Sequence, residues 1–249
     1  MSIFVYSGDG TQRVDELYDS LKDGLKQLKM NHDVKLINAA DIQSCLRQPS
    51  AKLFVLPGGR DMPYVRDISE DAIDCINEFI LGGGSFLGLC AGAYFSCSYV
   101  SFEEGKPLEV KGHRELKLFK GTGKGSVYPG FMYNSTKGSR IATLQCEGKL
   151  KESLGMTSYA YFNGGCEFIP DNEETNYVTL ATYHDTASKK AIVEVPGGKG
   201  KVILSGVHPE MDVEYLKATE YTSGQWEDMN KYNAEQRKLF VWCLKYLLE

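Results

Sequence analysis

Two short, uninterrupted runs of apolar residues constrain the fold of this chain more than any other feature. Residues 53–56 (LFVL) and 86–89 (FLGL) are each followed by a glycine-containing turn. A strand that is apolar on both faces must be covered on both sides, as in the parallel sheets of α/β proteins. Apolar residues at helical spacing precede the first run and separate the two, at Val14, Leu17 and Leu21 and at Ile73, Ile76 and Ile80. The sequence therefore predicts an α/β fold with a mostly parallel sheet.

The second half of the chain has a different pattern. Between about residues 102 and 204 the helical periodicity fades, and short β-type runs separated by glycine turns replace it. A final helix is predicted over residues 233–248. No Pro- or Ser-rich linker, repeat or low-complexity tract divides the chain, so we predict one domain over residues 1–249.

Charge and cysteine content narrow the class of protein. The 28 Lys+Arg and 33 Asp+Glu give a net charge of -5 without a basic run, which argues against a nucleic-acid partner. No apolar stretch approaches the roughly 18–20 residues of a membrane span, and residues 2–7 resemble a strand rather than a signal peptide. The seven cysteines lack paired spacing, which predicts a reducing, cytoplasmic location and no metal site. No cofactor is expected.

Cys90 lies in a turn that is typical of a catalytic nucleophile. Residues 88–92 (GLCAG) have the spacing of a nucleophile elbow, in which flanking glycines permit a strained turn at the tip of a strand. A helix N-terminus beneath a thiol favours the thiolate. The backbone N–H of Ala91 would point into the same space as an oxyanion donor. A buried structural cysteine is the alternative interpretation, and this motif by itself leaves both open.

His208 is the histidine best placed to act as a base. It ends the apolar run 202–207, at the edge of the sheet where α/β folds place their sites, and Glu210 follows two residues later. A carboxylate at that spacing can hold one ring nitrogen while the other faces a thiol. The alternative is a strand-end histidine beside a solvated glutamate.

Three segments in this order resemble the class I glutamine amidotransferases: residues 57–59 (PGG), 88–92 (GLCAG) and 208–210 (HPE). The resemblance implies a flavodoxin-like three-layer sandwich. It also implies that Cys90 is the nucleophile, His208 the base and Glu210 the orienting acid. The implied oxyanion donors are Gly58, Gly59 and Ala91.

Longer segments resemble the N-terminal domain of fungal-type biotin–protein ligases. They are residues 54–64 (FVLPGGRDMPY), 89–94 (LCAGAY), 114–116 (REL), 124–131 (KGSVYPGF), 161–165 (YFNGG) and 205–210 (SGVHPE). This resemblance runs over nearly the whole chain. It implies a role in protein biotinylation, with a covalently linked or separate ligase catalytic module and biotin-accepting carboxylases as partners.

Two departures from these families limit what they imply. Tyr94 stands four residues after the nucleophile, where glutamine-hydrolysing members carry Gln, so ordinary glutaminase activity is not expected. No Gly-Arg-Gly-Arg-type segment for biotinyl-adenylate is present, so this chain alone is not expected to form biotinyl-AMP. An excised domain and a short stand-alone relative both remain open.

A candidate substrate pocket consists of side chains with apolar area and polar tips, which suit a small amide or a peptide. Its predicted members are Arg60, Tyr64, Tyr94, Arg114, Tyr128, Tyr133, Tyr161 and Asn163. Packing under long loops is the alternative role of the tyrosines.

Two functional hypotheses follow. The first is a regulatory or scaffolding domain of a biotin–protein ligase with a Cys-His-Glu triad of unknown substrate. The second is a stand-alone cysteine amidase, glutaminase-like or peptidase-like hydrolase. They differ in whether Cys90 is reactive, and for a working triad we expect its sulfur within about 4 Å of a His208 nitrogen.

Overall fold

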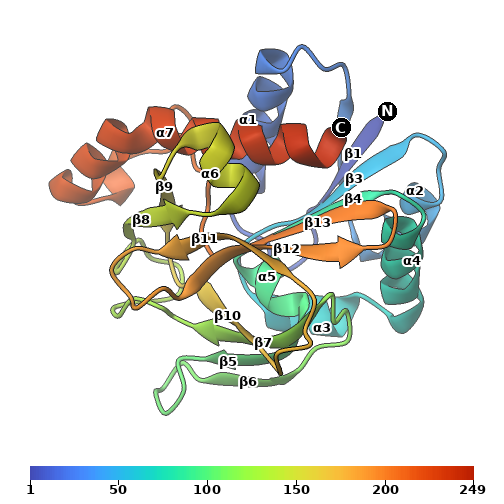
Figure 1. Cartoon of the computed structure of the whole chain (residues 1–249), viewed down its shortest axis with the longest axis horizontal. Coiled ribbons are helices and arrows are strands. Elements are labelled where there is room, and N and C mark those ends of the chain that lie inside the picture. The colour runs from blue at the N-terminus through green and yellow to red at the C-terminus, as the bar shows by residue number, and fades with distance from the viewer.

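Nine of the thirteen strands form one large sheet, and its two halves differ in strand direction (Figure 1). The computed structural model describes residues 1–249. Five neighbouring strands run parallel, in the order β2 (Asp33–Ile37), β1 (Ser2–Tyr6), β3 (Ala51–Leu56), β4 (Ser85–Leu89) and β13 (Gly200–Ser205). The sheet continues with the antiparallel strands β12 (Lys190–Gly197), β11 (Val178–Tyr183), β8 (Arg140–Cys146) and β9 (Thr157–Phe162).

The predicted mixed α/β architecture is confirmed, while the sheet is parallel over only part of its width. Four of its strand pairings are parallel and four are antiparallel. Parallel neighbours need a long crossover, usually a helix, whereas antiparallel neighbours can be joined by a short turn. The segment from β8 to β13 contains a single short helix, α6 (Gly148–Leu154). The strands that this segment gives to the large sheet therefore pair with one another antiparallel.

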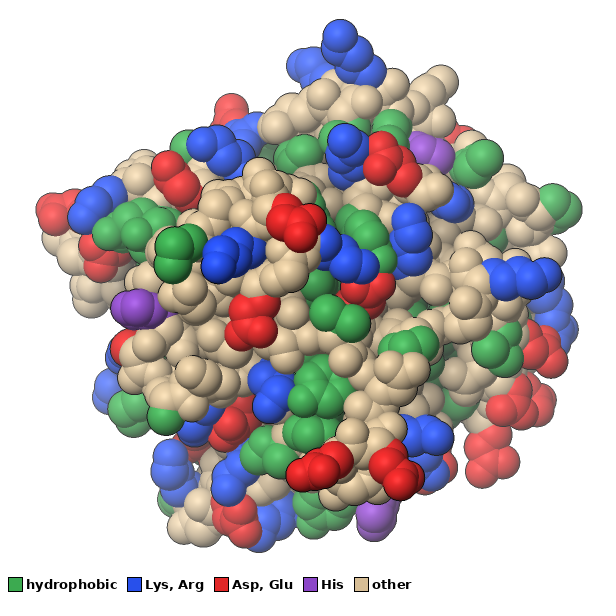
Figure 2. Space-filling view, in the orientation of Figure 1, with side chains coloured by type: hydrophobic (Ala, Val, Ile, Leu, Met, Phe, Trp, Pro, Cys, Tyr) green, Lys and Arg blue, Asp and Glu red, His purple; other side chains and the backbone are tan.

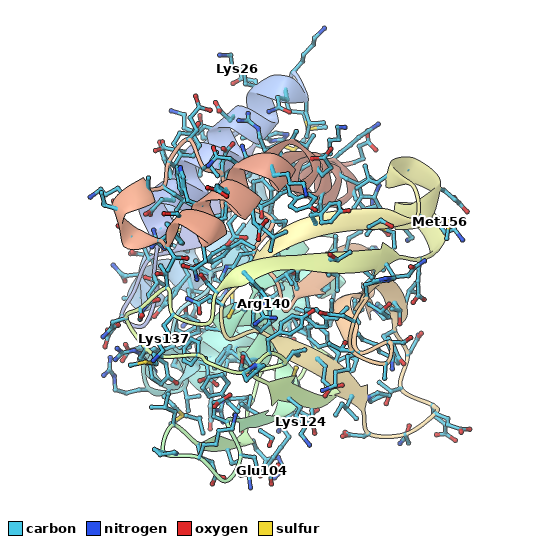
Figure 3. All side chains as sticks on the ribbon, turned by 90° about the vertical axis from the view of Figure 1, so that its left-hand side faces the viewer. Lys26, Glu104, Lys124, Lys137, Arg140 and Met156 are labelled. Atoms are coloured by element: carbon cyan, nitrogen blue, oxygen red, sulfur yellow. The ribbon has the colours of Figure 1, made fainter.

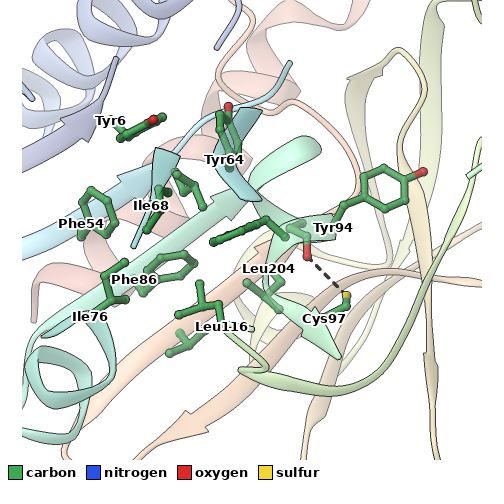
Figure 4. Packing of buried hydrophobic residues seen from close by; sticks show 14 of the residues in the cluster. Tyr6, Phe54, Tyr64, Ile68, Ile76, Phe86, Tyr94, Cys97, Leu116 and Leu204 are labelled. Atoms are coloured by element: carbon green, nitrogen blue, oxygen red, sulfur yellow. Dashed lines mark hydrogen bonds between the residues drawn. The ribbon is translucent and has the colours of Figure 1, made fainter. Parts of the chain in front are cut away.

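Helices cover both faces of the parallel strands (Figure 1). One face packs against α1 (Val14–Gln27) and α7 (Ser223–Leu248), and the other against α2 (Ile42–Leu46), α3 (Asp61–Asp67), α4 (Glu70–Leu81) and α5 (Ala91–Phe95). Successive residues of a strand point to opposite faces. In β1, Ile3 and Val5 accordingly join one core, and Phe4 and Tyr6 join the other, part of which Figure 4 shows. This two-sided burial explains the uninterrupted apolar runs.

A second, four-stranded sheet lies beside α5, below the large sheet in Figure 1. Its order is β10 (Cys166–Pro170), β7 (Phe119–Gly125), β5 (Cys97–Phe102) and β6 (Val110–His113). A loop of residues 126–139 leads from β7 to β8, and Figure 3 labels Lys137 on this loop and Arg140 at the start of β8. The second sheet and this loop supply one side of the pockets described below.

The C-terminal helix is longer than its apolar stripe predicted. α7 begins at Ser223 instead of residue 233, because Thr222 and Gln225 form a reciprocal capping box that satisfies free N–H groups of its first turn. None of the helices has both the length and the apolar character required to cross a membrane. On the face drawn in Figure 2, acidic and basic side chains are interspersed.

Candidate active site

The predicted catalytic segments meet at one edge of the large sheet. Cys90 directly follows β4, Gly58 and Gly59 follow β3, and His208 lies three residues after β13. These three strands are parallel neighbours, so their carboxyl ends lie side by side. The backbone N–H of Cys90 donates to the carbonyl of Ser205 in β13 at 2.8 Å, which ties the cysteine turn to the strand that leads to His208.

The Cys90 backbone has a conformation that side-chain-bearing residues rarely adopt. Its φ is 46° and its ψ is -101°, as expected for a strained turn that presents a nucleophile. A Cβ atom on Gly92 would lie 2.0 Å from the carbonyl oxygen of Leu56, so this position requires glycine. The helix that follows, α5, has only five residues. It therefore supplies less of a dipole to the thiol than a longer helix would.

His208 and Glu210 form a buried pair next to Cys90. Nδ1 of His208 lies 2.7 Å from Oε1 of Glu210, and the two residues are 7% and 2% exposed. Burial by itself lowers the pKa of His208. The charges of Glu210 and Cys90 and hydrogen bonds to both outweigh burial, and the pKa of His208 lies well above its usual value. Since Glu210 occupies Nδ1, the opposite ring nitrogen remains for the thiol.

Contacts from α1, α7 and β9 hold this segment in place. The Ser20 hydroxyl donates to the backbone carbonyl of Glu210 at 2.7 Å, and the backbone N–H of His208 donates to the Tyr161 carbonyl at 2.7 Å. Gln236, which is 1% exposed, accepts from the backbone N–H of Tyr161 at 2.5 Å and donates to the carbonyl of Met211. Sequence reasoning missed Gln236. Its polar side chain within the apolar stripe of a predicted helix was the available signal.

The turn after β3 provides two free backbone donors. The N–H groups of Gly58 and Gly59 donate to no protein acceptor. Gly59 has a φ of +137°, and a Cβ atom on Gly58 would lie 2.4 Å from Cε1 of His208. Glycine at position 58 thus gives the imidazole room beside this turn.

Two connected hollows share Gly59, Cys90, Phe131, Tyr133 and Asn163 and differ in the rest of their lining. The first, here called the apolar pocket, contains about 350 Å³ of empty space. Its lining is Gly59, Arg60, Asp61, Cys90, Ala91, Tyr94, Val100, Phe102, Phe131, Tyr133, Asn163 and Gly164. The second, the His208 pocket, contains about 480 Å³ and includes His208, Gly58 and Tyr161. It leads into an open polar basin lined by Gln12, Arg13, Asn134, Ser135, Thr136, Asn163 and Glu220.

The structure places five of the predicted pocket residues in these hollows: Arg60, Tyr94, Tyr133, Tyr161 and Asn163. Tyr94 donates its hydroxyl to the carbonyl of Gly164 at 3.0 Å. Phe102 and Phe131 also line the apolar pocket, and sequence reasoning missed both.

Three other predicted pocket residues lie elsewhere. Tyr64 is fully buried beneath the turn after β3 and donates to the carbonyl of Pro57 at 3.2 Å; Figure 4 shows it beside Tyr6. The Tyr128 hydroxyl contacts Asp185 at 2.5 Å. Arg114 is 3% exposed and makes two bonds to Asp61, at 2.8 and 2.7 Å. The local sequence does not reveal in which direction these three side chains point.

Comparison with known proteins then fixes the family. The family described as "Biotin-protein ligase, N terminal" matches residues 1–248. The chain belongs to the biotin–protein ligase N-terminal family. It is 35% identical over 219 residues to the biotin–protein ligase of Schizosaccharomyces pombe, an alignment that covers 86% of this chain and 34% of the ligase. The chain therefore spans about a third of the length of that relative.

An uncharacterized protein of Chlamydia muridarum is 34% identical over 190 residues, which are 76% of this chain and 69% of that protein. Among solved structures, the mmIFT52 N-terminal domain superposes with a TM-score of 0.59 at 11% identity and covers 97% of both chains. Cytoplasmic Protein STM3548 from Salmonella typhimurium gives 0.53 at 10% identity, over 99% of this chain and 98% of that one. These two structures share the fold of this chain, and at 10% and 11% identity they give no information on its function.

Proposed function

We propose that this chain is a regulatory domain in protein biotinylation whose Cys90, His208 and Glu210 form a reactive triad for acyl transfer. The buried His208–Glu210 pair beside Cys90 carries the proposal, because a carboxylate that holds Nδ1 directs the other nitrogen at the thiol. The strand order β2-β1-β3-β4-β13 supports a flavodoxin-like, class I glutamine amidotransferase-like domain over residues 1–249.

The chemistry follows from these positions. His208 takes the proton of the Cys90 thiol, and the sulfur attacks the carbonyl carbon of an amide. The carbonyl π electrons move to oxygen, where the N–H groups of Gly58, Gly59 and Ala91 stabilise the negative charge. When the C–N bond breaks, His208 returns the proton to the leaving amine. Water then attacks the thioester, His208 accepts its proton, and C–S cleavage releases a carboxylic acid and regenerates Cys90.

The family context sets the proposed partners. A ligase catalytic module, linked or separate, and biotin-accepting carboxylases would meet this domain in the cytoplasm, and its seven free cysteines suit a reducing compartment. A stand-alone amidase is the second candidate. It is favoured by the Chlamydia muridarum relative, because the alignment with this chain covers 69% of that protein.

Selective alkylation tests the triad. Limiting iodoacetamide should label Cys90 before the other cysteines, because burial raises the pKa of Cys146 to about 11 and that of Cys243 to about 12. His208→Ala should slow labelling of Cys90 at least several-fold, and Glu210→Gln should slow it less, because the acid acts through the imidazole. Mass spectrometry of the labelled peptides measures all of these rates.

Cys45 provides the control, because it is the one cysteine that is partly exposed. Cys45→Ser should leave the rate at Cys90 unchanged. Labelling of Cys45 with Cys90 untouched in the folded protein would remove the nucleophile and leave only a scaffolding role.

A further inference from the structure

We propose that the Cys90 centre acts on amides that join a bulky apolar acyl group to a polar, extended amine such as a peptide. This inference rests on the proposed acyl transfer and adds its substrate class. It is carried by the different linings of the two hollows that meet at Cys90.

The position of His208 decides which hollow holds which part of the substrate. The leaving amine must receive its proton from His208, so it lies in the hollow that His208 lines. That hollow is the His208 pocket. The apolar pocket is lined by Cys90 but not by His208, so it faces the acyl side.

Aromatic rings shape the acyl side. Phe102 and Phe131 meet edge to face with centroids 5.2 Å apart, and Phe131 and Tyr133 meet in the same way at 5.0 Å. With Val100 they form an apolar wall about the pocket. Phe131 and Tyr133 also line the His208 pocket, whereas Phe102 and Val100 line the apolar pocket and not the His208 pocket. An apolar acyl group buried there leaves water at a favourable free energy that scales with its area.

Most polar side chains of the apolar pocket are already engaged, and the exception is Asn163 at the junction of the two hollows. The Tyr94 hydroxyl bonds to the Gly164 carbonyl, and Asp61 is paired with Arg114. Arg60 lies over the ring of Tyr133 at 5.0 Å and donates to the Asn134 side chain at 2.9 Å. A glutamine side chain would therefore exchange several water partners for few protein ones here, which costs binding free energy.

The amine side is apolar near Cys90, where Phe131, Tyr133 and Met211 line it, and becomes polar toward Gln12, Arg13, Asn134 and Ser135. The His208 pocket opens into the polar basin, where none of the seven lining residues is hydrophobic. Asn163 lines both hollows and the basin, and its buried Oδ1 has no hydrogen-bond partner. A free acceptor at the junction suits the N–H of a peptide that extends from the scissile bond into the basin.

Two chloromethyl ketones that differ in one side chain test the acyl pocket. The probes are the ketones of N-acetyl-phenylalanine and N-acetyl-glycine, and the readout is the rate of Cys90 alkylation by mass spectrometry. The phenylalanine probe should react at least ten-fold faster. Phe102→Ala should reduce this preference at least five-fold, Phe102→Leu should retain most of it, and Tyr99→Ala, outside the pocket lining, should leave it unchanged.

Iodoacetamide, which carries no side chain, separates the two proposals. Failure of iodoacetamide to label Cys90 would overturn the proposed acyl transfer. Normal iodoacetamide labelling in every variant, with equal rates for the two ketones, would overturn the apolar acyl group alone.

The amine side is tested with two substrates that share the acetyl-phenylalanyl group, one ending in glycyl-serinamide and the other in cyclohexylamine. The peptide should be cleaved at least five-fold faster, and Asn163→Leu should reduce that ratio. A faster reaction of the cyclohexylamide would overturn the polar assignment.

Discussion

Among single residues, His208 has the environment that most affects chemistry. It is buried, which disfavours its charged form, yet the neighbouring Glu210 carboxylate and Cys90 hold its pKa well above the usual value. A protonated imidazole beside a cysteine favours the thiolate, the form that attacks. The charge of Glu210 is thus what we expect to set the protonation state of His208.

Replacement of this charge tests that role. Glu210→Gln keeps the side-chain shape and removes the carboxylate, so the pKa of His208 should fall, as read from its ring protons by NMR titration. A folded-state pKa above the unfolded value of about 6.5 stabilises the fold below that pH, and this stability is lost as pH rises through the folded pKa. Urea unfolding should therefore show a wild-type advantage near pH 6 that shrinks in alkali. An advantage that grows with pH would contradict this account.

At the scale of elements, α7 positions the segment that contains His208 and Glu210 through one side chain. Gln236 satisfies the backbone N–H of Tyr161 in β9 and the carbonyl of Met211 just after Glu210. The Tyr161 carbonyl in turn accepts from the backbone of His208. The helix therefore connects the antiparallel half of the sheet to the segment after β13 by hydrogen bonds as well as by apolar packing.

Loss of Gln236 should affect both stability and reactivity. Gln236→Leu leaves two buried backbone groups unsatisfied, at about 1–3 kcal/mol each, which urea unfolding measures. Labelling of Cys90 by iodoacetamide should also slow, because the His208 segment loses a support. Asn230→Ala, at an exposed position of the same helix, should change stability by no more than about 0.5 kcal/mol. Equal effects of the two substitutions would show that Gln236 is no more than a surface-like contact.

At the scale of the whole molecule, α7 packs against both halves of the large sheet. It contacts β3, β4 and β13 in the parallel half and β8 and β9 in the antiparallel half. Its buried residues Leu239, Leu244 and Leu247 belong to one core cluster with strands of both halves. This continuity predicts that residues 1–249 unfold as one unit.

The two tryptophans make this testable, since Trp226 and Trp242 are both on α7. Tryptophan fluorescence during urea unfolding reports this helix, whereas far-UV circular dichroism reports the whole chain. The two transitions should coincide in midpoint and slope. A separate, earlier fluorescence transition would contradict a single domain.

Local patterns in the sequence were sufficient to predict the backbone conformation at the candidate site. Apolar runs buried on both faces predicted the parallel strands, and the glycines around Cys90 predicted its strained turn. The HPE segment predicted the His208–Glu210 contact, because residues two positions apart in the sequence have neighbouring backbones. Each of these features depends on near neighbours, which the sequence states directly.

Only the tertiary structure decided which side chains surround Cys90, His208 and Glu210. It placed Tyr64, Arg114 and Tyr128 away from the pocket, and it brought Phe131 and Gln236 to the site from distant segments. It also made half of the large sheet antiparallel. The direction of a side chain and the partner of a strand depend on contacts between residues far apart in the chain. Such contacts are set by the packing of the whole core, not by any local pattern.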